Sequence, residues 1–163
     1  MKKTILIFGL LLISLISLGQ KKVDLKFNLG PEFFTPTGFL MDTHFTGIGG
    51  MFEMEVLPVK HKKVGYVLVS GYDYIMGRGS NQSLFQAPGL VGVRLHVDSI
   101  ISISQMAGVS FFNENEGFKQ TFCTSVRFDI GILGVETKLI TALRPGHGND
   151  ITGFVVRLSY RIK

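Results

Sequence analysis

The sequence predicts an all-β protein, an eight-stranded antiparallel up-and-down transmembrane β-barrel that follows a short export segment. Three observations predict this fold. Apolar and polar residues alternate along nearly the whole chain after residue 19, the alternating runs number eight, and long polar connections alternate with short ones. The 20 glycines and 14 phenylalanines suit strands and tight turns, and a single cysteine excludes a disulfide framework.

Residues 1–19 form a predicted secretory signal peptide, which divides the chain into a cleaved segment (1–19) and a barrel domain (20–163). Lys2 and Lys3 provide the basic start, and a mostly apolar run from Ile5 to Leu18 ends in small residues. This run is shorter than the roughly 18 to 20 apolar residues of a retained membrane helix. Removing the segment lowers the formal charge from +5 to +3, which is too mild to indicate nucleic-acid binding.

The eight runs define the expected strands in order. The last run is the clearest, because Phe154, Val156 and Leu158 share one face while Arg157, Ser159 and Arg161 share the other. Reading the chain with this template gives strands at 23–34, 43–57, 63–77, 83–97, 100–112, 118–130, 134–143 and 152–162. Each strand with its connection has about 18 residues, which exceeds the roughly 9 to 11 needed to cross the hydrocarbon layer.

The connections alternate in character. Long polar segments are expected at 35–42, 78–82, 113–117 and 144–151, and short ones near 58–62, 98–99 and 131–133. Outer-membrane barrels show this asymmetry, with longer loops outside and tight turns at the periplasmic rim.

One face of the expected sheet is apolar on every strand, and we assign it to lipid. Its members are Val23, Leu25, Phe27, Leu29, Ile48, Phe52, Met54, Val56, Tyr66, Leu68, Tyr72, Tyr74, Phe85, Val91, Val93, Leu95, Ile101, Ile103, Val109, Phe111, Phe122, Val126, Phe128, Ile130, Val135, Leu139, Phe154, Val156, Leu158, Tyr160 and Ile162. The four tyrosines are expected near the membrane interface, where aromatic side chains anchor barrels.

The opposite face carries balanced charge, and we expect it to form a salt-bridged network inside the barrel. Its members are Asp24, Lys26, Glu53, Glu55, Asp73, Arg94, His96, Arg127, Asp129, Glu136, Lys138, Arg157 and Arg161. The interior of an eight-stranded barrel is just wide enough for side chains to fill, so buried charges there must pair. Glu53 and Glu55 are expected to meet arginines from other strands in a closed lumen.

Glycines within the strands are expected to allow the bends that a narrow barrel needs. Pro88 lacks a backbone donor in a sheet without an edge, and we expect a β-bulge near it.

The mature chain resembles the small eight-stranded outer-membrane barrels of Bacteroidetes-type bacteria, the PorT-like and OmpA-like group. Ser17-Leu18-Gly19 before Gln20 is similar to their cleavage sites, Val126–Lys138 to their penultimate hairpin, and Gly153–Ile162 to their C-terminal strand. The chain departs from the pattern by ending in Lys163, with Tyr160 as the nearest aromatic residue. The resemblance implies an integral outer-membrane protein of a Gram-negative bacterium, with membrane lipid and the barrel-assembly machinery as its partners.

No residue pattern predicts catalysis, a cofactor or a metal site. His44 could be combined with Glu53 or Ser80, but its context lacks the pattern of barrel deacylases, and we interpret it as a polar loop residue. His61, His96 and His147 share no spacing suited to one metal ion. His96 beside Arg94 could sense pH, although a paired lumen residue is the simpler interpretation.

We therefore expect a non-enzymatic barrel with a structural or surface-interaction role and no identifiable protein partner. Two alternatives stay open. One is a narrow pore for small solutes. The other is a secreted soluble barrel that binds a lipophilic ligand, which would place the apolar face inward and the charges outward.

Overall fold

The computed structural model describes residues 23–58, 63–113, 117–143 and 150–162. The predicted signal peptide, His61 and His147 lie outside these ranges. Among the described residues, no helix has the length and apolar character needed to cross a membrane.

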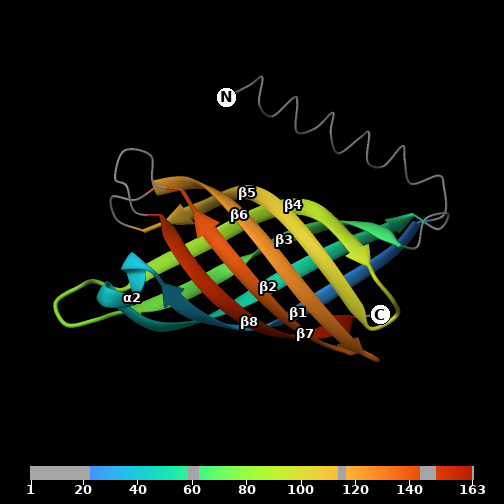
Figure 1. Ribbon diagram of the computed structural model, residues 1–163, viewed down its shortest axis with the longest axis horizontal. Helices are drawn as coiled ribbons and strands as arrows, with labels where there is room; N and C mark the ends of the chain where they lie inside the picture. Colours follow the sequence, from blue (N-terminus) through green and yellow to red (C-terminus); the bar gives the residue numbers. More distant parts are fainter. Residues whose placement is uncertain (1–22, 59–62, 114–116, 144–149, 163) are drawn as a thin grey trace, which may run out of the picture.

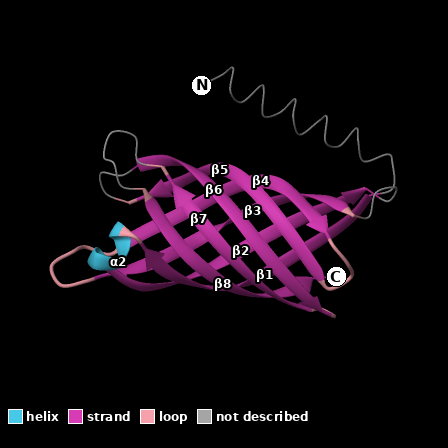
Figure 2. Cartoon of the chain, viewed as in Figure 1, coloured by secondary structure: helices cyan, strands magenta, loops and turns pink. Residues whose placement is uncertain are grey.

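Eight antiparallel strands form a closed barrel in which each strand pairs with its neighbours in the chain and β8 pairs with β1 (Figures 1 and 2). The predicted fold class is confirmed. The strands are β1 (Val23–Thr37), β2 (His44–Pro58), β3 (Val64–Gly77), β4 (Leu84–His96), β5 (Ile101–Phe112), β6 (Gly117–Ile130), β7 (Leu133–Ala142) and β8 (Ile151–Ile162).

The connection predicted at 35–42 is wrong in detail. Residues 35–37 continue β1, and a one-turn helix, α2 (Phe39–Thr43), follows Gly38. Gly38 has a φ of 59°, a left-handed conformation that glycine adopts without steric cost. Leu40 of α2 is buried against the barrel, which is why this connection has its own packed structure.

The two ends of the barrel differ. At one end, left in Figure 1, lie α2 and the final residues of β3, β5 and β7, and we call this the loop end. At the other end, the turn end, β2, β4 and β6 finish, and β6 is joined to β7 through residues 131–132 alone. In the β4–β5 turn, Asp98 Oδ1 accepts hydrogen bonds from the backbone N–H groups of Ile100 and Ile101, each at 2.6 Å. These two bonds lower the pKa of the exposed Asp98 carboxyl below its ordinary value.

The strand register sets the tilt of the strands. Following the pairs once around the barrel from Phe27 leads back to Thr37, ten residues further along β1. A stagger of this kind accompanies the strand tilt of closed barrels, visible in Figure 2.

The β-bulge predicted near Pro88 is wrong. Pro88 pairs with Ser110 of β5, and the β3–β4 pairs on both sides of it, Ser70↔Gly89 and Asp73↔Gln86, keep one register. The strand accommodates the missing N–H by leaving the β3–β4 ladder unpaired for two residues, without inserting an extra one. The described register shift lies in β2 between His44 and Gly47.

Closure of the barrel requires a glycine where β1 meets β8. A Cβ atom on Gly30 would lie 1.7 Å from the backbone carbonyl oxygen of Leu158. Gly50 differs, because it faces outward and a Cβ there would meet only the ring of Tyr72, at 3.6 Å or more. A side chain at Gly30 would therefore block the approach of β1 to β8, whereas the outer surface of β2 has room for a methyl group at Gly50.

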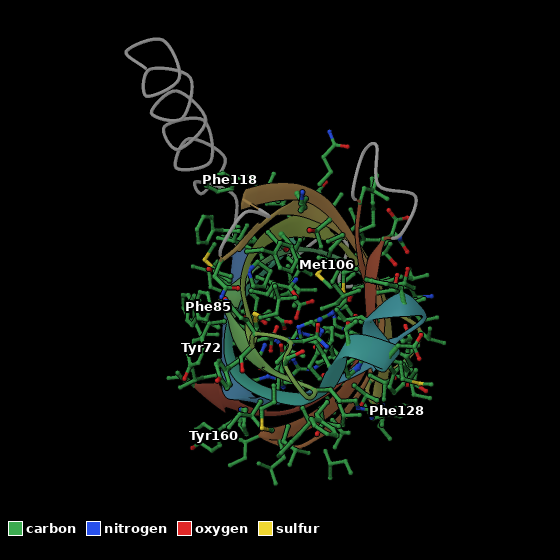
Figure 3. The ribbon with its side chains drawn as sticks, turned by 90° about the vertical axis from the view of Figure 1, so that its left-hand side faces the viewer. Tyr72, Phe85, Met106, Phe118, Phe128 and Tyr160 are labelled. Atoms are coloured by element: carbon green, nitrogen blue, oxygen red, sulfur yellow. The ribbon has the colours of Figure 1, made fainter. Side chains whose placement is uncertain are left out.

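The outer surface is apolar, with aromatic residues toward both ends. Figure 3, viewed from the loop end, shows Tyr72, Phe85, Phe118, Phe128 and Tyr160 outside the wall. Tyr66, Phe128 and Tyr160 lie near the turn end, whereas Tyr74, Phe85, Phe111 and Phe118 lie near the loop end. Tyr72 lies five residues before the end of β3 at Gly77, so it is further from the membrane interface than predicted.

The middle of the outer surface carries small residues on seven consecutive strands. We call this band the waist. It consists of the outward-facing residue at or next to the centre of each strand from β1 to β7, Pro31, Gly50, Ser70, Gly89, Ala107, Thr124 and Thr137. Along β1–β3 the waist forms a shallow apolar hollow of ≈ 680 Å³ between Phe52 and Tyr72.

The interior has two parts, and the sequence predicted only one of them. Toward the loop end the lumen is filled by an apolar plug of buried residues, Phe34, Leu40, Ile75, Leu84, Phe112 and Ile151. Gly153 makes room for the Phe34 ring, since a Cβ there would lie 2.0 Å from it. The prediction of a salt-bridged interior was therefore incomplete. Near the loop end, the inward-facing positions of the strands hold apolar side chains in place of charged ones.

Candidate functional site

Toward the turn end, the lumen is filled by charged side chains that converge on Glu53 of β2. Its carboxylate accepts hydrogen bonds from Arg94 Nη1 at 2.6 Å and Nη2 at 3.0 Å, from Arg127 Nη1 at 3.0 Å, and from Arg157 Nη2. The three arginines come from β4, β6 and β8. All four side chains are at most 1% exposed, so one carboxylate neutralises part of three buried cations.

Glu136 of β7 is the second acceptor in the network. Its Oε1 accepts from Arg94 Nη2 at 3.1 Å and from the Ser125 hydroxyl at 2.6 Å, and its Oε2 accepts from Arg157 Nη2. Arg94 and Arg157 therefore bridge Glu53 and Glu136. Such shared, bidentate contacts suit the planar guanidinium group, which offers five donors in a rigid arrangement.

Two polar residues of β1 complete the network, and neither was predicted. Glu32 is fully buried, pairs with Lys138 Nζ, and lies 3.8 Å from Arg157 Nε. Asn28 donates to Glu53 at 3.0 Å and accepts from Arg127 at 3.0 Å. Both face inward like Lys26, two and six residues further along β1. Gly30 and Pro31 lie between them and interrupt the alternation of apolar and polar residues, so the sequence pattern does not show clearly which face they occupy.

The network extends to the opening of the barrel at the turn end through two sets of ion pairs, one containing His96 and the other Arg161. His96 Nε2 lies 2.6 Å from Glu55 Oε1, and Glu55 Oε2 lies 3.6 Å from Arg94. Asp129 accepts from Arg127 Nε at 2.8 Å and lies 3.1 Å from Arg161 Nη2. Arg161 has 22% of its side chain exposed, the largest fraction among these ion pairs. The ion pairs thus become more exposed toward this end.

Asp73 is placed inside the lumen but outside the ion pairs. Among the described residues, neither of its carboxylate oxygens has a hydrogen-bond partner, although the residue is fully buried. It lies in a continuous row of paired residues, Glu32↔Gly49↔Asp73↔Gln86, just below the apolar plug. Asp24 is exposed and Lys26 half-buried near the turn end, so these two contribute less to the interior than predicted.

The described residues hold no cluster of three or more histidine, cysteine or acidic side chains suited to a metal ion. Cys123 faces inward and is buried. His44 starts β2 at the loop end, with Nδ1 2.8 Å from the Thr43 hydroxyl. Glu53 lies nine residues further along the same strand, a separation of about 30 Å for an extended chain. The structure therefore does not bring His44 and Glu53 together.

The charged side chains fill the lumen and neutralise one another's charge. Four buried cations, Arg94, Arg127, Lys138 and Arg157, are interleaved with the carboxylates of Glu32, Glu53, Asp129 and Glu136, which lie on β1, β2, β6 and β7. Because each cation is held by at least one carboxylate, the desolvation cost of the charges is offset within the network. Figure 3 shows nitrogen and oxygen atoms gathered inside the ring of strands.

Comparison with known proteins identifies the fold. The barrel is similar to the outer membrane protein Ail of Yersinia pestis in a phospholipid bilayer nanodisc, with a TM-score of 0.60 and 7% identity over 86% of this chain and 100% of that one. It is also similar to a de novo designed transmembrane β-barrel, with a TM-score of 0.55 and 12% identity over 84% and 95% of the two chains. A second designed barrel, TMB2.3, has a TM-score of 0.53 and 13% identity over 88% and 98%.

At these identities the similarity establishes the fold, a closed eight-stranded barrel of the transmembrane type, and nothing finer. No family model matches the chain, and no curated protein matches its sequence.

Proposed function

We propose that this protein is an integral outer-membrane barrel with a closed lumen and a structural or surface-interaction role, without catalysis. The observation that carries the proposal is the inversion of an ordinary soluble core. Large apolar side chains such as Leu29, Val91 and Phe122 are 45–59% exposed on the outside, while Glu53, Arg94 and Arg157 are at most 1% exposed within. An exterior of this kind is stable in hydrocarbon and aggregates in water.

The two alternatives place different demands on the interior. A soluble carrier of a lipophilic ligand needs an apolar cavity inside and charges outside, which is the opposite of the observed arrangement. A pore needs a continuous hydrated path. Against a pore stand the plug of Phe34, Phe112 and Ile151 at one end and the Glu53 network at the other.

The finer features of the proposal come from the sequence. We propose export through cleavage after Gly19, assembly by recognition of the C-terminal strand, and a place among the barrels of the PorT-like and OmpA-like group. The aromatic residues at both ends of the outer surface support a wall that spans the membrane. Tight turns such as 131–132 are typical of the periplasmic side, which supports an orientation with α2 at the cell surface.

Two measurements test the proposal. The refolded protein should migrate faster on a gel before boiling than after, and it should partition with lipid vesicles and not with the aqueous phase. Planar bilayers containing the inserted protein should show no conductance steps above the lipid background. Identical migration before and after boiling would contradict the barrel in a membrane, whereas reproducible conductance steps would contradict the closed lumen and favour the pore.

A further inference from the structure

One polar pair on the outer surface lies where the proposed function places hydrocarbon. Thr124 Oγ1 of β6 donates a hydrogen bond to Gln105 Oε1 of β5 at 2.9 Å, and both side chains are exposed. Thr124 belongs to the waist and Gln105 is the fifth of the twelve residues of β5. Their outward-facing neighbours are Ile103, Val93 and Phe122, which are 43–45% exposed. The pair is therefore surrounded by the lipid-facing surface.

The hydrogen bond with Thr124 leaves the Gln105 amide incompletely paired. A carboxamide has two N–H donors and an oxygen that accepts two hydrogen bonds. Within the described chain, the two donors have no partner, and the oxygen has used one of its two positions. Hydrocarbon offers neither donors nor acceptors, so unpaired amide groups there cost several kcal/mol in transfer free energy.

Serine and threonine at the same depth do not have this problem. Their single hydroxyl hydrogen can bond to a nearby carbonyl oxygen or, as for Thr124, to a neighbouring side chain. Gln120 also faces outward on β6, but it is the fourth residue from the loop end, where water and headgroups can satisfy it. Gln105 is thus the carboxamide whose position in the membrane demands a protein partner.

We propose that this face of the barrel, β4–β6 around Gln105, binds a second copy of the chain in the membrane. A carboxamide is complementary to itself, because two of them can form a reciprocal pair of N–H···O bonds. A two-fold interface brings each residue near the axis opposite its own copy, which is the geometry that this pair requires. The inference rests on the proposed function, since the demand exists only in a bilayer.

The neighbouring surface permits the approach. Ala107 lies two residues from Gln105 on the same face of β5, and Gly89 and Ser70 continue the waist across β4 and β3. Small residues allow two membrane-embedded surfaces to come close enough for interchain hydrogen bonds. On the opposite side of the barrel, the larger Leu29 is the outward residue next to Pro31 on β1, and Val156 is the outward residue next to the centre of β8.

The test measures association of the folded protein in detergent micelles by sedimentation, with Gln105→Leu as the variant and Gln120→Leu as the matched control. Both variants exchange an outward glutamine for leucine, but only the first removes the proposed amide pair. Loss of two such hydrogen bonds should raise the dimer dissociation constant roughly tenfold to thirtyfold. Gln120→Leu should leave it unchanged.

A second measurement keeps Gln105 intact. In a Cys123→Ala background, Ala107→Cys should form an oxidised dimer in vesicles, and Leu29→Cys on the far side should not. A heat-modifiable protein that stays monomeric, or that dimerises equally with Gln105→Leu, overturns the inference and leaves the membrane barrel standing. Cross-linking through Leu29→Cys alone would also overturn it. Failure to insert or to show heat-modifiable migration would overturn the proposed function instead.

Discussion

Replacing Glu53 by glutamine tests whether the lumen network stabilises the barrel. Glu53→Gln keeps the shape of the side chain but removes the negative charge that three arginines share. Removing one partner of a buried ion pair typically costs about 3–5 kcal/mol, because the other charge stays buried. Arg94 and Arg157 retain Glu136, and Arg127 retains Asp129. We therefore expect the lower end of that range, about 3 kcal/mol of unfolding free energy.

Asp73→Asn is the matched control. It also exchanges a fully buried carboxylate for an amide, but the Asp73 oxygens have no partner among the described residues. Its effect should be near zero or stabilising, because no ion pair is broken and an uncompensated charge is removed. Reversible guanidinium unfolding in lipid vesicles, followed by heat-modifiable migration, compares the two variants. If both variants lose stability equally, or if Asp73→Asn is the more harmful, the network does not stabilise the barrel as argued.

Three further predictions follow from the wall of the barrel. Gly30→Ala should abolish the fast-migrating folded form, whereas Gly50→Ala should preserve it, because only the first places a Cβ atom against backbone. On the outer face of β4, Val91→Arg near the centre should cost about 2–4 kcal/mol and Leu95→Arg near the turn end about 0–1 kcal/mol; equal costs in vesicle unfolding would argue against a membrane boundary. The amide protons hydrogen-bonded to Asp98 should titrate in NMR spectra with a midpoint below the ordinary aspartate value, because their bonds lower the pKa of that carboxyl and are lost as the pH falls through it; a midpoint at or above that value would contradict the turn geometry.

The fold could be predicted from the sequence because strand parity is a local property. In the run from Val156 to Ile162, each residue reveals its face by its chemistry, and the same holds for Glu53 and Glu55 on β2. The identity of each ion pair could not be predicted, because it depends on register around the whole barrel. Arg157 reaches Glu53 only after eight strands have closed at a particular stagger.

The residues that sequence reasoning missed share a physical cause. Glu32 lies beside Gly30 and Pro31, where the alternation is broken, and Phe34 and Phe112 face inward although they resemble the lipid-facing phenylalanines. Hydrophobicity does not distinguish an apolar plug from a lipid contact, because both environments exclude water. The sequence also could not show that Asp73 lacks a partner. That outcome depends on the residues that register places beside it, Glu32 on β1, Gly49 on β2 and Gln86 on β4.

The separation of the Glu53 contacts along the chain has a consequence for assembly. Its three arginines lie 41, 74 and 104 residues away in sequence, so no single hairpin can neutralise them. A half-made sheet would carry bare cations on one surface, and a strand slipped by one residue would turn them toward the lipid tails. Closure and charge compensation must therefore occur together. When β8 pairs with β1, the buried charges are neutralised only if every earlier strand pair has the correct register.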